Sequence, residues 1–260
     1  MKPLFTKTIL IFLLVQIAAL AIGAQFITNN VTAVENPQNT ETPLYLFGII
    51  VIFAIALLAV LKVYKGNLLF LFIELATLFI AVQLLLSTII PEGFAILVAI
   101  AAIAVRLKWN ETRQALLLIT IAVVGALLGA SLDIFPAALL AALLAGYDIV
   151  AVFYTKHMIT LAKDLGNRGA AFSIKIFDKK EKLELGTGDI VIPAMLIVAS
   201  EKIGTKIAFT SAPALIGIIG AALGLYVLLY ILQKRKGYLP ALPPITAGTL
   251  LGILIGTVLF

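Results

Sequence analysis

Three acidic residues lie inside continuously apolar stretches of the 260-residue sequence, namely Glu74, Asp148 and Asp189. A carboxylate in the hydrocarbon of a membrane is costly, and one that is kept there usually has a function. Asp148 precedes Lys156 by eight residues, so about 12 Å of helix separates it from the end of its stretch. Asp189 follows Leu185 by four residues, or about 6 Å. We therefore expect the two aspartates at similar depth on neighbouring stretches.

Two facing carboxylates suit the hydrolysis of a peptide bond. Like charges in contact cannot both ionise, so the pair holds one proton between them. The ionised partner takes a proton from water as the water attacks the scissile carbonyl, and the protonated partner donates toward the carbonyl oxygen. The titration belongs to the pair, so neither role is assigned to one residue. Structural hydrogen bonding and proton relay are the alternative roles, and for Glu74 an interior hydrogen bond is expected rather than catalysis.

The composition indicates which elements position these acids. Hydrophobic residues make up 62% of the sequence and charged residues 12%, whereas soluble domains are about a quarter charged. The apolar stretches are each near the roughly 20 residues that a helix needs to cross the hydrocarbon, and they lack the alternation of barrel strands. We expect an all-α polytopic membrane protein with nine transmembrane helices in a single domain, 1–260. The spans are predicted at 8–27, 43–62, 67–89, 91–106, 114–132, 134–156, 186–203, 209–232 and 241–260.

The basic residues support this count of spans. With nine spans, all of the 19 lysines and arginines except Lys202 and Lys206 fall on one side of the membrane. Cytoplasmic loops collect basic residues, so the N-terminus is expected in the cytoplasm, the C-terminus outside, and both aspartates in the cytoplasmic half of the membrane. The net charge of +6 follows this topology and predicts no nucleic-acid partner. The alternative for the first span is a signal peptide, because Lys2 and Lys7 precede its apolar run.

Few residues are available for other catalytic chemistry. The sequence has no cysteine, which excludes disulfides, thiolate metal sites and a cysteine nucleophile. His157 is the only histidine, and one histidine without a cysteine or acidic cluster does not make a metal site. We expect neither a metal ion nor a cofactor.

Three short motifs surround the two aspartates, on the sixth, seventh and ninth predicted spans. They are Tyr147-Asp148, Gly186-Thr187-Gly188-Asp189 and Pro240-Ala241-Leu242. In this order, and over the whole nine-span layout, they resemble the presenilin and signal peptide peptidase family of GxGD intramembrane aspartyl proteases. The small size is similar to that of a prokaryotic, archaeal member. A second Pro-Ala-Leu at 213–215 starts the eighth span on the outer side, and we interpret it as a coincidence.

The resemblance implies catalytic roles for Asp148 and Asp189 and implies that the segment 240–242 shapes the active site. Gly186 and Gly188 have no side-chain bulk, so they would let the chain enter the membrane partly unwound and let a substrate backbone approach. The alternative is a plain helix start after a loop. Thr187 lies between these two glycines. The nearby Tyr147 is expected to contact the substrate or to hydrogen-bond near the pair, and a role in packing alone is the alternative.

Prolines mark the start of the ninth span. Proline has no backbone N–H to donate, and three prolines lie here, namely Pro240, Pro243 and Pro244. They predict an irregular start to this span. With the N-terminus inside, the layout is presenilin-like. The resemblance then implies single-span membrane protein substrates with their N-termini outside, cleaved within the lipid bilayer. The sequence carries no signal for an oligomeric state.

The cytoplasmic loop 157–185 is the longest polar stretch. Ile174 and Ile176 alternate with polar residues, and Leu183 and Leu185 do so again, which predicts a short β-hairpin between helices six and seven. An exposed strand edge there could pair with an unwound substrate by β-augmentation. A disordered or interfacial amphipathic loop is the alternative.

Two other functions share parts of this pattern. Intramembrane acids and helices broken by glycine and proline are also typical of a proton-coupled transporter or channel, but such a protein should show internal pseudo-symmetry, which this sequence lacks. A prepilin-type peptidase also carries a Gly-x-Gly-Asp motif and cuts its substrates near the membrane surface. The placement of Tyr147 and of the segment 240–242 argues against that class.

Overall fold

The computed structural model describes residues 2–34, 36–64, 66–154, 173–178, 181–207, 210–234 and 239–260. Along these residues the chain forms nine α-helices, with a β-hairpin between the sixth and the seventh. The helices are α1 (Lys2–Thr28), α2 (Thr42–Val63), α3 (Leu68–Ser87), α4 (Glu92–Lys108), α5 (Arg113–Ser131), α6 (Ile134–Ile149), α8 (Gly188–Ser200), α9 (Ala212–Lys234) and α10 (Leu242–Leu259). The prediction of a polytopic helical protein with this hairpin is confirmed.

Seven of the helices in the described ranges are long and apolar enough to cross a membrane on their own. The shorter two are α4, with 17 residues, and α8, with 13. At 1.5 Å per residue α8 is about 20 Å long, which is less than the hydrocarbon thickness of about 30 Å. Its residues 192–200 are all buried. Since protein covers α8, the helix does not need to span the hydrocarbon alone.

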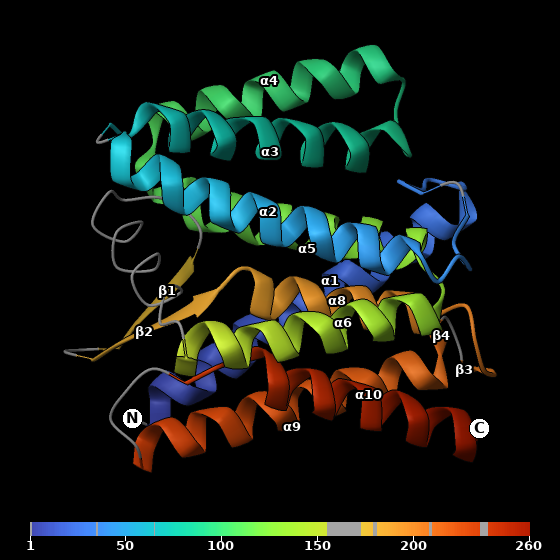
Figure 1. Cartoon of the computed structure of the whole chain (residues 1–260). Helices are drawn as coiled ribbons and strands as arrows, with labels where there is room; N and C mark the ends of the chain where they lie inside the picture. The colour runs from blue at the N-terminus through green and yellow to red at the C-terminus, as the bar shows by residue number, and fades with distance from the viewer. Residues whose placement is uncertain are drawn as a thin grey trace.

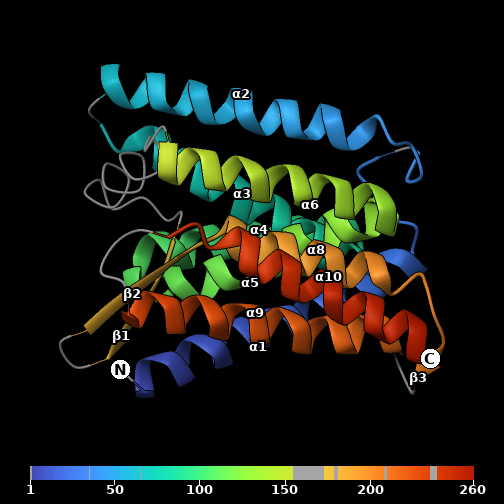
Figure 2. The ribbon, with the colours of Figure 1, turned by 60° about the horizontal axis from the view of Figure 1, so that its bottom comes forward.

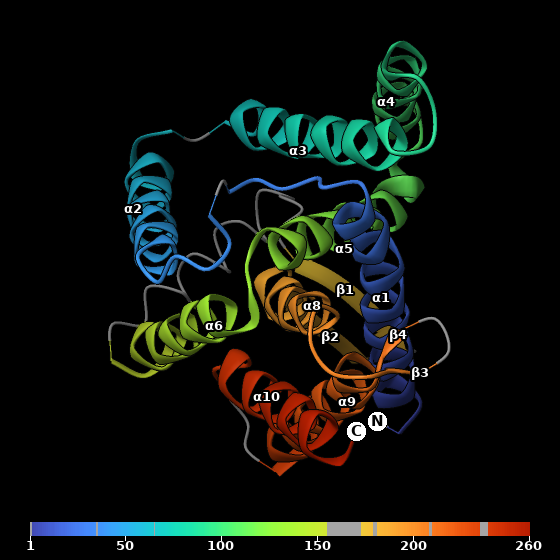
Figure 3. The same cartoon turned by 90° about the vertical axis from the view of Figure 1, so that its right-hand side faces the viewer.

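The short helix α8 lies at the centre of the bundle. It contacts α1, α5, α6, α9 and α10, which surround it in the view along the helices (Figure 3). The helices α2, α3 and α4 form an outer arc, in which α2 contacts α6, and α3 contacts both α4 and α5. Helix α1 packs into this core, where Phe12, Val15 and Ala19 lie in one buried cluster with residues of α8.

Glycines allow the closest helix contacts. A Cβ built on Gly23 of α1 would lie 2.3 Å from Val198 Cγ1 of α8, and one on Gly129 of α5 would lie 2.5 Å from the Met195 carbonyl oxygen. Between α9 and α10 the approach is closer still, because a Cβ on Gly220 would lie 2.1 Å from a backbone oxygen of α10. Small residues let membrane helices pack backbone to backbone in this way.

The hairpin lies at one end of the bundle. Its strands are β1 (Ser173–Asp178) and β2 (Glu181–Gly186), and they pair in antiparallel register with Ile174 opposite Leu185. These two side chains are buried in the cluster that contains the first half of α1. The N-terminus lies at this end, while the C-terminus and the short pair β3 (Lys206–Ile207) and β4 (Thr210–Ser211) lie at the opposite end (Figures 1 and 2).

Two short segments complete the description. The 3-10 helix η1 (Asn110–Thr112) joins α4 to α5, and a π-helix, η2 (Val150–Tyr154), continues α6. His157, with the part of the predicted loop up to residue 172, lies outside the described residues.

Candidate active site

Asp148 lies near the end of α6, two residues before the backbone changes from α-helix to π-helix at Val150. Single π-helical turns occur often at functional sites, because the wider turn moves the neighbouring side chains relative to a regular helix. The Asp148 carboxylate is partly buried. It accepts a hydrogen bond of 3.2 Å at Oδ2 from the backbone N–H of Leu242. The first residue of α10 therefore helps to orient the acid of α6.

Asp189 lies in the first turn of α8, directly after the strand β2 has ended at Gly186. Its carboxylate lies over this glycine. A Cβ built on Gly186 would lie 2.9 Å from Asp189 Oδ2. Residue 186 must therefore be glycine for the carboxylate to keep this position, a steric requirement that local sequence reasoning did not identify.

The two carboxylates lie close enough to interact electrostatically. The contact between α6 and α8 brings them together, in the apolar interior of the bundle. The structure thus places two acids, 41 positions apart in the sequence, on facing helices. Such a pair can hold one proton and act on a water molecule between acid and base.

The Pro-Ala-Leu segment 240–242 packs beside this pair. Leu242 is buried with Ile192 and Leu196 of α8 in one apolar cluster. The prediction of an irregular start to the last helix is wrong beyond residue 241, because α10 is regular from Leu242 and carries Pro243 and Pro244 in its first turn. Proline is tolerated there, because the N–H groups in the first turn of a helix have no hydrogen-bond acceptor within the helix. Pro240 and Ala241 lie just before the helix.

The remaining predicted residues lie around the same centre. Tyr147 packs edge-on against Phe47 of α2, with ring centroids 6.3 Å apart. Thr187 is the N-cap residue of α8, although its side chain makes no capping hydrogen bond. A Cβ on Gly188 would meet nothing within 4 Å, so open space lies beside this glycine. The contact with Phe47 was not predicted, because nothing in the sequence around residue 47 indicates which helix it meets.

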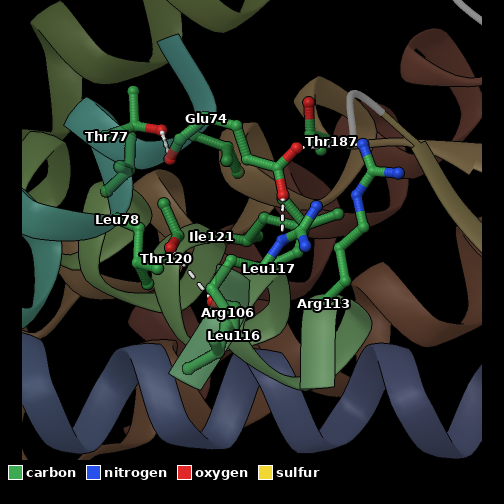
Figure 4. Close-up of a pocket in the computed structure, with 12 residues that line it drawn as sticks. Glu74, Thr77, Leu78, Arg106, Arg113, Leu116, Leu117, Thr120, Ile121 and Thr187 are labelled. Carbon is green, nitrogen blue, oxygen red and sulfur yellow. Dashed lines mark hydrogen bonds and ion pairs between the residues drawn. The ribbon is translucent and has the colours of Figure 1, made fainter. Parts of the chain in front are cut away.

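A cavity of about 170 Å³ reaches Thr187 from the side of α3 and α5. At its polar end Glu74 of α3 forms ion pairs with Arg106, at 2.6 Å, and with Arg113, at 2.9 Å. Figure 4 shows the Glu74 carboxylate with Arg106 below it and with Thr187 and Arg113 to its right. The third intramembrane acid is therefore neutralised by two guanidinium groups, in agreement with the expected interior contact.

No group of three or more histidine, cysteine, aspartate or glutamate side chains suited to a metal ion occurs among the residues searched, which are the described ones.

The family profile described as "Signal-peptide peptidase, presenilin aspartyl protease" matches residues 9–260. The chain belongs to this family. It is therefore an intramembrane aspartyl protease, a hydrolase that acts on membrane proteins within the lipid bilayer. Membership in this family decides against a transporter and against a prepilin-type peptidase.

Solved structures of presenilin-family proteins are similar to the whole chain. One, a presenilin family intramembrane aspartate protease in space group C222, is 28% identical, with a TM-score of 0.76 over 98% of this chain and 99% of that chain. Another, in space group P2, is 27% identical, with a TM-score of 0.70 over 97% of this chain and 96% of that chain. No curated protein matches the chain.

Proposed function

We propose that Asp148 and Asp189 are the catalytic pair of this protease. The observation that carries the proposal is that the two carboxylates lie on contacting helices in an apolar interior, close enough to interact electrostatically. One carboxylate takes a proton from water, and the resulting hydroxide equivalent forms a bond to the scissile carbonyl carbon. The other carboxyl protonates the carbonyl oxygen, which gives a neutral tetrahedral diol. Collapse of the diol breaks the C–N bond and returns one hydroxyl proton to the carboxylate that had protonated the carbonyl oxygen. The proton taken from water passes from the first carboxyl to the leaving amine.

Neighbouring backbone and side chains shape this centre in the proposal. The amide of Leu242 fixes the rotamer of Asp148, and the absence of a side chain at Gly186 leaves room for the carboxylate of Asp189. The open space beside Gly188 admits the substrate backbone. Tyr147 contacts the substrate next to the pair. Thr187, Pro240 and Ala241 complete the wall of the site.

The strand β2 offers a template for the substrate. A transmembrane helix hides its peptide bonds, so the segment to be cut must first be extended. The strand β1 contacts α1 and α5, whereas β2, among the described residues, pairs only with β1 and leads directly into the first turn of α8. We infer that an unwound substrate pairs with the outer edge of β2 and thereby reaches Asp189.

The proposed substrates are single-span membrane proteins with their N-termini outside. The basic residues predict a cytoplasmic N-terminus and an external C-terminus for a single membrane domain 1–260. For an enzyme in this presenilin-like orientation, the resemblance to the family implies substrates with external N-termini. The N-terminus and the hairpin lie at the same end of the bundle, which supports an active site that opens toward the cytoplasmic side (Figure 1).

Cleavage of a single-span substrate in proteoliposomes tests the proposal, with the products mapped by mass spectrometry. We expect a cut within the hydrophobic segment of the substrate, and no cleavage by Asp148→Asn or Asp189→Asn. A matched control is Asp133→Asn, since Asp133 lies at the other end of α6 and pairs with Lys202. Cleavage by either of the first two variants at the wild-type rate would refute the assignment.

A further inference from the structure

The first turn of α8 is weakly held by its own backbone. Pro193 follows Asp189 by one turn, and proline has no N–H to donate to the carbonyl group four residues before it, which is that of Asp189. The proline ring also crowds the preceding turn of the helix. Thr187, at the N-cap, adds no side-chain hydrogen bond. Asp189 therefore needs support from another element.

This support comes from α1. Gln16 Nε2 donates a hydrogen bond of 3.2 Å to the carbonyl oxygen of Ile190, the residue directly after Asp189. Both side chains are fully buried, at 0% exposure. On α1 the neighbours of Gln16 are apolar, and Phe12, Val15 and Ala19 belong to the same buried cluster as Ile190. The amide is thus a polar contact point on a mostly apolar helix that packs against α8.

The free-energy cost of burying the Gln16 amide indicates that its contact with Ile190 has a function. A buried polar group without a hydrogen bond is unfavourable, and buried amides normally satisfy both of their ends. Gln16 satisfies only one, because its Oε1 has no partner among the described residues. An apolar side chain of the same length would avoid this cost and would fill the same space. The glutamine is therefore better explained by its bond to Ile190 than by the stability of the fold.

We propose that Gln16 is a positioning residue for the catalytic centre. By holding the Ile190 carbonyl it fixes the first turn of α8 against α1, and so fixes the direction in which Asp189 meets Asp148. The inference rests on the proposed catalytic role of Asp189. Gln16 does not touch the reacting atoms and acts through the α8 backbone.

The variant Gln16→Met tests this role, because methionine keeps the length of the side chain and removes both polar atoms. We expect kcat to fall about fivefold, which corresponds to the loss of one hydrogen bond of about 1 kcal/mol, while KM changes less than twofold. The Tm should not fall, since the unpartnered Oε1 is removed as well. The matched control is Thr8→Val, because the Thr8 hydroxyl is also buried in α1 but bonds only within its own helix, to the Leu4 carbonyl. Its kcat should equal that of the wild type.

A double-variant cycle with Pro193→Ala links the effect to α8. Alanine restores the N–H for the Asp189 carbonyl, so α8 can support its own first turn. In this background Gln16→Met should change kcat less than twofold. A fivefold loss in both backgrounds, or a lower Tm with unchanged kcat, would overturn the positioning role.

Assays of Asp189→Asn in the same experiment distinguish a failure of the proposed catalytic pair from a failure of the positioning role of Gln16. Full activity of Asp189→Asn would overturn the proposed catalytic pair, and this inference with it. An inactive Asp189→Asn together with a wild-type kcat for Gln16→Met would overturn this inference alone.

Discussion

Replacement of Gly186 by alanine should impair catalysis without unfolding the protein. The added Cβ would lie 2.9 Å from Asp189 Oδ2, whereas ordinary contacts of this kind begin at 3.4 Å. The carboxylate must therefore move by about 0.5 Å. A displacement of 1 Å at a reacting group costs about 10²-fold in rate, so we expect kcat to fall about tenfold, or about 1.4 kcal/mol in activation free energy.

The backbone itself should accept the substitution. Gly186 is not among the described residues with positive φ, and the nearest atoms to the new Cβ belong to Asp189. The assay is the initial rate of cleavage of a single-span substrate, with Tm measured on the same preparation. Gly146→Ala is the matched control, because Gly146 lies two residues from Asp148 and a Cβ there would meet nothing within 4 Å. A wild-type kcat for Gly186→Ala, or an equal loss for Gly146→Ala, would refute the steric reasoning.

Three further predictions concern the surroundings of the pair. Gly188→Ala fills the open space beside the motif, so it should raise KM several-fold with a smaller change in kcat; steady-state kinetics would contradict this if kcat alone fell. Gly220→Ala forces a Cβ against the α10 backbone and should destabilise the fold by about 1–3 kcal/mol, seen as a lower Tm, whereas Gly48→Ala meets open space and should not. Glu74→Gln leaves two arginines without their carboxylate and should cost about 3 kcal/mol; an unchanged Tm would show that the ion pairs add nothing to stability.

The helices and the hairpin could be predicted because their signals are local. Each apolar run is long enough to indicate a helix by itself, and the alternation of Ile174 and Ile176 with polar residues predicts a strand with one buried face. The order of the three motifs on the predicted spans indicated that Asp148 and Asp189 lie on neighbouring helices.

Contacts across large sequence separations could not be predicted in the same way. The hydrogen bond from Leu242 to Asp148 joins residues 94 positions apart. Glu74 forms ion pairs with arginines that lie 32 and 39 positions away in the sequence. The amide of Gln16 reaches Ile190 across 174 positions. Such contacts depend on how helices rotate and slide against each other, which periodicity does not specify.

The two glycines of the motif also differ in a way that the sequence does not specify. Gly186 and Gly188 are equivalent in the motif, and both were expected to provide space for the substrate. In the structure only Gly186 lies against the carboxylate of Asp189, while Gly188 faces open space. The difference arises from the turn between β2 and α8, which the residue types alone do not define.

The rate of cleavage by the single and double aspartate variants tests the central claim most directly. Initial rates would be compared in proteoliposomes for the wild type, Asp148→Asn, Asp189→Asn and the double variant, with Tm showing that each protein is folded. Residues that act as one catalytic unit are non-additive. The account predicts that each single variant loses at least about 10³-fold in rate and that the double variant is no slower. A single variant that keeps a tenth of the wild-type rate, or losses that add in the double variant, would contradict a shared catalytic pair.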